Sequence, residues 1–220
     1  MVLDIDNTTL GARRATPVAA RLARRALEQR EADYADEIRR LLDAGVAEMR
    51  KRGTASTPRV ADIVAAAGLS NEAFYRHFKS KDALVVAILR DGTERLVSYL
   101  AHQMAKDTEP EDRIRRWVAG VLAQADDDSA STTLAVLANA GGAAEGIATG
   151  RHPASASLAA LLHEPIAALG NPEPELVASL AAHAVLGQLT DHLWQGTPVR
   201  RKECERAIAF VLDACRGATR

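Results

Sequence analysis

Hydrophobic positions recur three and four residues apart along almost the entire chain, whereas the alternation of apolar and polar residues typical of strands is rare. Alanine, leucine, arginine and glutamate, which all favour helices, are abundant. The pattern therefore predicts an all-α protein.

Capping residues divide the first half of the chain into helices. Thr16 followed by Pro17 predicts a basic leader helix that extends to about Arg30 and can continue into a second helix at 31–52. Two short helices and one long helix are expected at 58–67, 71–77 and 81–106. Their predicted N-caps are Thr57, with Pro58 at the first helical position, Ser70 and Ser80, and Gly53 and Gly68 are predicted helix ends.

The second half contains further helical patterns separated by breaks rich in glycine and proline. The helices are predicted at 111–126, 130–140, 154–169, 174–195 and 200–216. The breaks between the last four lie at 141–142 and 150–153, 171–172 and 196–198.

Composition limits the class of protein. The chain of 220 residues is 47% hydrophobic with a net charge of −1, which suits a folded protein with a sizeable core. Its only cysteines, Cys204 and Cys215, lie too far apart on one predicted helix to bridge each other and are interpreted as packing residues. Because no apolar run reaches the roughly 20 residues of a membrane span, we expect a cytoplasmic protein without membrane contact.

Charge is distributed unevenly along the chain. Residues 1–90 carry a net charge of +4 and residues 91–220 a net charge of −5. A basic segment on an acidic protein indicates a module that binds a polyanion, although a difference of this size also arises by chance.

Residues 57–84 have the pattern of a helix-turn-helix, in which the second helix can enter the major groove of DNA. Gly68 permits a left-handed conformation at the turn, and the alanines at 65–67 allow the two helices to approach closely. Phe74 and Phe78 are predicted to fill the small core between them.

The polar residues that remain suit phosphate groups and base edges. Ser70 and Asn71 stand at a helix N-terminus, where free backbone N–H groups and the helix dipole favour an anion. The residues best placed to read bases are Asn71, Glu72, Ala73 and Arg76. The complete predicted DNA-binding set is Arg59, Ser70, Asn71, Glu72, Ala73, Tyr75, Arg76, His77 and Lys81.

Four groups of residues in this stretch form a specific signature: Ala67-Gly68-Leu69-Ser70, Phe74-Tyr75, His77-Phe78 and Lys81-Asp82-Ala83-Leu84. The signature closely resembles that of the TetR (tetracycline-repressor-like) family of bacterial regulators, over about residues 32–90. The resemblance implies that Tyr75 and Lys81 contact phosphates. Glu72 departs from the family pattern, which commonly has a small residue there, so this carboxylate either reads cytosine or repels phosphate.

The resemblance also implies an N-terminal helix-turn-helix head on a larger helical domain for ligand binding and dimerisation. We therefore divide the chain into a basic leader at 1–30, a DNA-binding domain at 31–80 and an effector-binding and dimerisation domain at 81–220. Arms of such proteins can follow the minor groove, and the leader arginines suited to this role are Arg13, Arg14, Arg21, Arg24 and Arg25. Equally, these arginines could form a solvated helix face that pairs with nearby acidic residues.

A single helix-turn-helix covers about half of an operator, so we expect a homodimer on a palindromic double-stranded DNA operator. Apolar and small residues at 176–187 and 204–215 form stripes on the last two helices that suit the dimer contact. By resemblance, the middle helices hold a cavity for a small-molecule effector of unknown identity. Its candidate polar residues, each of which could equally be an ordinary core or surface residue, are Tyr99, Gln103, Trp117, His163, His183, Gln188 and Trp194. The scarcity of aromatic residues favours an aliphatic or small ligand.

Two other functions compete with a ligand-responsive repressor. One is a regulator that keeps the DNA-binding head but has no effector. The other is a helical enzyme, whose nearest constellation is His163, Glu164, His183, Asp191 and His192, but no metalloprotease, phosphate-loop, nucleophile-elbow or Cys/His metal motif accompanies it. We therefore expect a repressor that is not an enzyme and needs no cofactor or metal.

Overall fold

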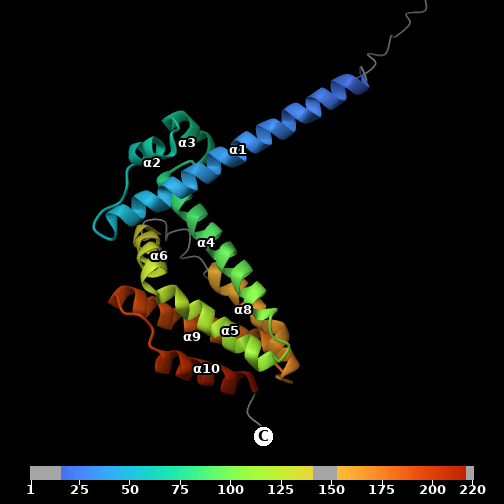
Figure 1. Ribbon diagram of the computed structural model, residues 1–220, viewed down its shortest axis with the longest axis vertical. Coiled ribbons are helices and arrows are strands. Elements are labelled where there is room, and N and C mark those ends of the chain that lie inside the picture. The colour runs from blue at the N-terminus through green and yellow to red at the C-terminus, as the bar shows by residue number, and fades with distance from the viewer. Residues whose placement is uncertain (1–15, 141–152, 217–220) are drawn as a thin grey trace, which may run out of the picture. The chain divides into compact units, whose positions relative to one another are not determined.

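The computed structural model describes residues 16–140 and 153–216, and all regular structure in these residues is helical (Figure 1). The helices are α1 (Pro17–Arg52), α2 (Val60–Ala67), α3 (Asn71–His77), α4 (Lys81–Met104), α5 (Pro110–Leu122), the short 3₁₀ turn η1 (Ala123–Ala125), α6 (Asp127–Ala140), α8 (Pro153–Ala168), α9 (Pro174–Gln195) and α10 (Arg201–Arg216). The all-α prediction is confirmed. Within these residues, no helix is both long and apolar enough to span a bilayer.

The chain divides into two compact units, residues 1–39 and 40–220. Helix α1 contributes to both, so the predicted leader helix and second helix form one continuous helix. At its start, the Ala19 N–H donates to the Thr16 hydroxyl at 3.2 Å, as the predicted cap requires. At its end, Gly53 has a φ of 57°, the left-handed conformation expected of a glycine that stops a helix.

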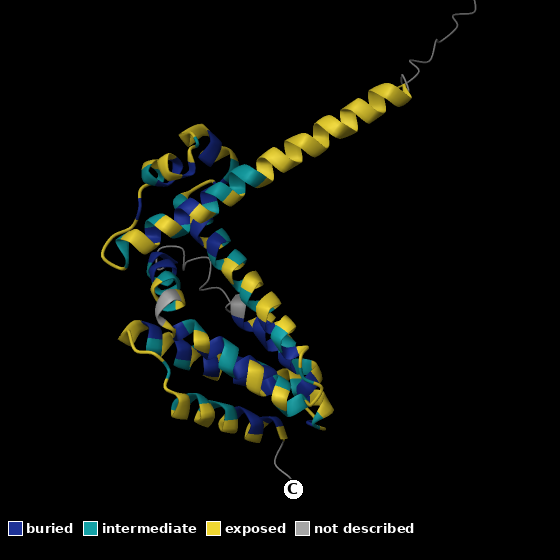
Figure 2. Ribbon diagram, in the orientation of Figure 1, coloured by how far each residue is buried: buried dark blue, intermediate teal, exposed yellow. Residues whose placement is uncertain are grey.

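The described part of the first unit is a helical segment without a buried face. Residues 16–35 are all exposed (Figure 2), including the apolar side chains of Val18, Leu22 and Leu27. A helix without a buried stripe gains no stability from packing within its own unit.

The head of the second unit is built from the last turns of α1, from α2 and α3, and from the first turns of α4. Leu41, Met49, Ile63, Phe74 and Leu84 are completely buried, and together they supply the apolar side chains of this small core. The prediction that the phenylalanines fill it is confirmed.

Gly45 marks a close approach between α1 and α4. A β-carbon added there would lie 2.8 Å from Ile88 Cδ1 and 3.2 Å from Leu84 Cδ2. Because carbon atoms pack at roughly 3.5–4.0 Å, only glycine fits without displacing these side chains.

Polar contacts fix the turn between α2 and α3. The Arg40 guanidinium donates to the Ala67 carbonyl at 2.5 and 3.0 Å and to the Gly68 carbonyl at 3.0 Å. These carbonyls belong to the end of α2, where helix geometry leaves acceptors without intrahelical donors. Gly68 itself has a φ of 63°, as the predicted left-handed turn requires.

The predicted start of α2 is wrong. Arg59, not Thr57, is the N-cap residue, and its backbone N–H donates to the Asp62 carboxylate at 3.2 Å. The same carboxylate accepts from Arg52 of α1 at 2.7 Å. The side chain that caps the start of α2 is therefore that of Asp62, the third residue of the helix, and an ion pair with Arg52 of α1 holds it in place. Of the three alanines expected to allow close packing, only Ala67 is buried, whereas those at 65 and 66 are exposed.

The body of the second unit has a core centred on α5, α8 and α9. The Trp117 side chain is completely buried there, and its indole N–H donates to the Leu158 carbonyl at 3.0 Å. Helices α8 and α9 pack side by side along much of their length. The predicted helix boundaries in this half agree with the structure to within three or four residues, and the predicted breaks at 141–142 and Gly150 lie outside the described residues.

The C-terminal helix is fastened to the body at its end. Arg216 of α10 forms an ion pair with Glu111 of α5 at 2.8 Å, and the Asn171 side-chain amide donates to the Cys215 carbonyl at 3.0 Å. Both cysteines are free thiols. Burial raises the pKa of Cys215 to about 11 and also raises the pKa of Cys204, so neither thiol is poised to react, which agrees with a packing role.

We predict that replacing Arg40 with methionine destabilises the second unit. The variant leaves the carbonyls of Ala67 and Gly68 without their charged donor, and we expect a loss of about 1–3 kcal/mol in the free energy of unfolding, measured by urea titration. Arg39→Met is the matched control, because the Arg39 side chain is 68% exposed and pairs with Asp36, whose side chain is 45% exposed. Equal stability of the two variants would contradict the role of Arg40.

Candidate nucleic-acid interface and ligand cavity

Helix α3 is anchored by one face and presents the other to solvent. The Ser70 hydroxyl accepts from the Ala73 N–H at 3.1 Å and so confirms the predicted cap. Phe74 is completely buried, and its ring lies 5.8 Å from that of Phe78 and 5.2 Å from that of Tyr75, measured between centroids. The short helix is therefore held by its aromatic side chains rather than by its length.

The predicted base-reading residues fall into two groups. Asn71, Glu72 and Arg76 are exposed on α3. Ala73 is only 3% exposed, so the structure does not support the prediction that it contacts a base. Its methyl group lies on the buried side of α3 with Phe74. Adjacent positions of a helix are about 100° apart, so one wide face can bury both side chains in the small core.

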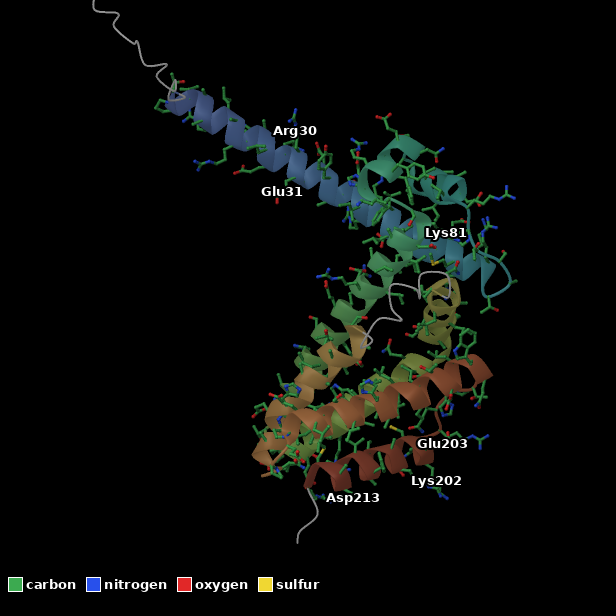
Figure 3. All side chains as sticks on the ribbon, turned by 180° about the vertical axis from the view of Figure 1, so that it is seen from behind. Arg30, Glu31, Lys81, Lys202, Glu203 and Asp213 are labelled. Atoms are coloured by element: carbon green, nitrogen blue, oxygen red, sulfur yellow. The ribbon has the colours of Figure 1, made fainter. Side chains whose placement is uncertain are left out.

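The predicted phosphate contacts surround this helix. Tyr75 is 59% exposed, and Lys81 lies half-buried in the first turn of α4 (Figure 3). Arg59 is exposed at the start of α2. Lys79, which the prediction did not include, is a further exposed cation directly after Phe78.

The charges on α3 are arranged along its axis. Glu72 lies in the first turn, and Arg76 and His77 lie in the last turn. This arrangement stabilises the helix dipole, but it places a carboxylate beside the N–H groups that an anion would use. The exposed end of α3 therefore suits base edges more than a phosphate, and the exposed cations on its flanks suit phosphates.

The comparison with protein families decides the identity of this head. Residues 41–88 match the model of bacterial regulatory proteins of the tetR family. This range contains every predicted DNA-binding residue, from Arg59 to Lys81.

The head, residues 41–88, therefore matches the DNA-binding domain of tetR-family regulators.

Solved structures share the fold of this chain. The reduced form of NemR from E. coli is 20% identical, with a TM-score of 0.61 over 81% of this chain and 97% of that chain. A TetR-family transcriptional regulator from Pectobacterium atrosepticum is 20% identical, with a TM-score of 0.57 over 83% and 92%. The fatty acid degradation regulator FadR from Bacillus halodurans is 18% identical, with a TM-score of 0.53 over 82% and 98%. Among curated protein sequences, no significant match is found.

The second unit contains a cavity of about 800 Å³, which is within the size range of small-molecule sites. Helices α1, α4, α6, α8 and α9 and the 3₁₀ turn η1 line it. Its lining residues include Leu42, Val46, Ile88, Leu96, Val136, Leu158, Leu186 and Leu193 among the apolar side chains, and Arg50, Asp91, Arg95, Gln124, Thr133 and His183 among the polar side chains.

The seven candidate polar residues, His163 included, do not gather at this cavity. Only His183 lines it. Gln188 lines a smaller groove of about 340 Å³ between α9 and α10, whereas Trp194 and Tyr99 are about half exposed elsewhere. Trp117 is a core residue whose indole N–H already donates to the Leu158 carbonyl. The side-chain oxygen of Gln103 accepts a hydrogen bond from Lys106 at 2.8 Å. Helical spacing alone could not show which side of each helix faces the cavity.

The last two helices carry exposed apolar side chains. On α9, Leu176 and Leu180 are 51% and 61% exposed, and on α10 Phe210 is 62% exposed. The predicted α10 stripe is largely an internal one, because Val211, Leu212 and Cys215 lie in the core of the body. The exposed stripe of α10 is instead on the side of Phe210, adjacent to the smaller groove.

The enzyme constellation is not assembled as a metal site. Among the residues that the structure describes, no group of three or more His, Cys, Asp or Glu side chains could hold a metal ion. Glu164 forms an ion pair with Arg113 of α5. Asp127 and Asp128 lie in the first turn of α6, and their side chains are outside the described set.

The arginines of the leader are available for an external partner. Arg21, Arg24 and Arg25 are exposed, and no ion pair or hydrogen bond of these three side chains occurs in the described residues. Their spacing of three and four places them on one side of α1. Arg13 and Arg14 lie outside the described residues.

We predict that deleting residues 1–28 reduces the salt dependence of DNA binding. Each lost phosphate contact lowers the slope of log K against log salt by about 0.9 in B-DNA. The measurement is fluorescence anisotropy at several salt concentrations. Glu28→Gln and Glu31→Gln in the full chain serve as controls, since they alter the acidic side of the same helix. An unchanged slope after the deletion would favour the solvated-face interpretation.

Proposed function

We propose that this TetR-family protein is a ligand-responsive transcriptional repressor that acts as a homodimer on a palindromic operator. The observation that carries the proposal is the exposed polar side of α3, with Asn71 and Arg76 on a helix that is anchored through Phe74. A helix presented in this way can enter the major groove of double-stranded DNA.

The residues around α3 divide the work of recognition. Tyr75, Lys81 and Arg59 are proposed to contact phosphates and so to position the head, because they flank the helix. Asn71 suits adenine, Arg76 suits guanine and Glu72 suits the amino group of cytosine. The phosphate-binding set is extended by Lys79, which is exposed directly after Phe78.

The ligand cavity supports regulation by a small molecule. Its wall includes Leu42 and Val46 of α1 and Ile88 of α4, helices that also build the head, together with Leu186 of α9 in the body. A ligand in contact with both groups of helices can favour one arrangement of the head. A preference of about 1–3 kcal/mol would change DNA affinity about 5–150-fold. Similar structures include a fatty acid degradation regulator and a protein linked to control of antibiotic production by bacterial hormones.

The exposed apolar residues of α9 and α10 support the homodimer. Leu180 and Phe210 lie on helices that are adjacent in the chain, and a symmetric pair of such faces is self-complementary. Two heads about 34 Å apart would then meet successive major grooves of a palindromic site.

We predict that two classes of substitution have different effects on DNA binding. Tyr75→Phe and Lys81→Ala should weaken binding to all sequences alike, and Lys81→Ala should lower the salt slope by about 1. Asn71→Ala and Arg76→Ala should lower the preference for the best operator over single-base variants by about 1–3 kcal/mol. Anisotropy titrations with a selected operator and its variants measure both effects. If all four substitutions gave the same profile, the division of roles would be wrong, and absence of binding at low salt would remove the DNA-binding function.

We predict that Phe210→Asp breaks the dimer. A charge in the apolar contact should cost about 2 kcal/mol or more of dimer stability, and sedimentation velocity should then show a larger monomer fraction. Operator affinity should fall with it, whereas Glu205→Ala, an exposed change on another side of α10, should leave both unchanged. A dimer that persists in Phe210→Asp would place the contact elsewhere.

A further inference from the structure

The interior of the large cavity is aliphatic. Its buried lining residues include Ile88, Val136, Leu158, Leu189 and Leu193, and none of the described residues that line it is Phe, Tyr or Trp. A flat aromatic ligand would therefore find no ring for stacking, and a cationic ligand would find no aromatic face. Aliphatic chains gain from such a wall through burial of apolar surface alone.

Both arginines of the cavity wall are exposed and already partnered. Arg95 is exposed and forms an ion pair with Asp91 at 2.6 Å. Arg50 is also exposed and is engaged in an interaction of its own. With Asp43, the wall holds two acidic and two basic side chains, so its formal charge is balanced. A ligand carboxylate would have to compete with an existing partner for either arginine, and an uncompensated charge in an apolar site is costly.

Neutral polar groups remain for the head of a ligand. The Thr133 side chain is half-buried, and its hydroxyl has no hydrogen bond within the described residues. His183 Nδ1 lies 2.6 Å from the Ser179 carbonyl and therefore donates to it, which leaves Nε2, when it carries no proton, as an acceptor. Gln124 uses its Nε2 toward the Gly120 carbonyl, which leaves the amide oxygen as a second acceptor.

We propose that this cavity binds an uncharged aliphatic molecule with a hydroxyl head group. The hydroxyl donates to an acceptor of the wall, His183 Nε2 or the Gln124 oxygen, and accepts from the Thr133 hydroxyl, while the alkyl chain packs against the leucines and valines of α4, α6, α8 and α9. This inference rests on the proposed ligand response and names the chemical class of the effector.

Gly92 of α4 allows the cavity to be filled without disturbing the fold. It lines the cavity, and a β-carbon added there meets no atom within 4 Å. The residue is in the middle of a helix without a positive φ, where a larger side chain is compatible with the backbone. Gly92→Leu should therefore occupy ligand space, and Ser98→Leu, on an exposed position of the same helix outside the cavity, is the matched control.

The experiment titrates the full-length chain with probes that share one alkyl chain. Isothermal titration calorimetry compares 1-octanol, sodium octanoate and octylammonium chloride, with 2-naphthol as an aromatic alcohol. We expect 1-octanol to bind more tightly than each of the other three by about tenfold or more, which corresponds to about 1.4 kcal/mol. Gly92→Leu should abolish this binding with helix content and melting temperature preserved, and Ser98→Leu should retain it. Thr133→Val should weaken it by about two- to tenfold.

Each other outcome overturns a defined part of the inference. Octanoate or octylammonium binding as tightly as octanol would exclude the uncharged class, and tighter binding of 2-naphthol would exclude the aliphatic class. In both cases, blockage by Gly92→Leu would leave the ligand response standing. If no probe bound while the chain still bound its operator, both the ligand class and the ligand response would fall, and a regulator without effector would remain. Loss of operator binding is measured separately by anisotropy and bears on the DNA-binding function alone.

Discussion

The orientation of α3 depends on the way in which α2 ends. At this point the Arg40 guanidinium satisfies two carbonyls at the C-terminal end of α2, and Gly68 adopts the left-handed conformation that turns the chain toward Ser70. Because α3 is only seven residues long, it cannot maintain its own position through helix propensity. The turn and the buried Phe74 together determine which side chains of α3 meet solvent, so the proposed recognition of DNA depends on a contact made by Arg40, which is not itself proposed to touch DNA.

The contact made by Arg40 also shows that a basic residue counted toward a polyanion-binding signal can instead have a structural role. Arg40 and Arg52 lie in the basic half of the chain, and their charge contributes to the sequence signal for polyanion binding. In the structure, both guanidiniums are used internally, by the end of α2 and by Asp62. The exposed cations that remain near α3, including Arg59 and Lys79, are therefore a smaller set than the composition indicates.

Local signals in the sequence predicted much of the fold because they act over three or four residues. Ser70 and Ser80 each accept from the backbone N–H three positions later, and a serine before a helix is sufficient to indicate this. The prediction that Thr57 caps α2 was wrong because the capping contact there is not local. The carboxylate of Asp62 accepts the backbone N–H at the helix start, and it is held by Arg52, ten positions earlier in the chain. The predictions that Trp117 lines a ligand site and that Ala73 contacts a base were not supported. Helical spacing shows which residues share one face of a helix, but it does not show which neighbouring element covers that face. The cavity depended on five helices at once, and only His183 of the predicted set lies on its wall.

Ile88 joins the cavity and the head at one side chain. It is buried, it lines the cavity, and its terminal methyl carbon occupies the space that a β-carbon of residue 45 would need. The Ile88 side chain therefore stands between the cavity and the backbone of α1 at Gly45. Under the proposed ligand response, a ligand that pushes this isoleucine toward α1 meets backbone there and not a side chain. An alanine at position 45 would press on the same terminal methyl from the opposite side and would first shift the flexible end of this isoleucine.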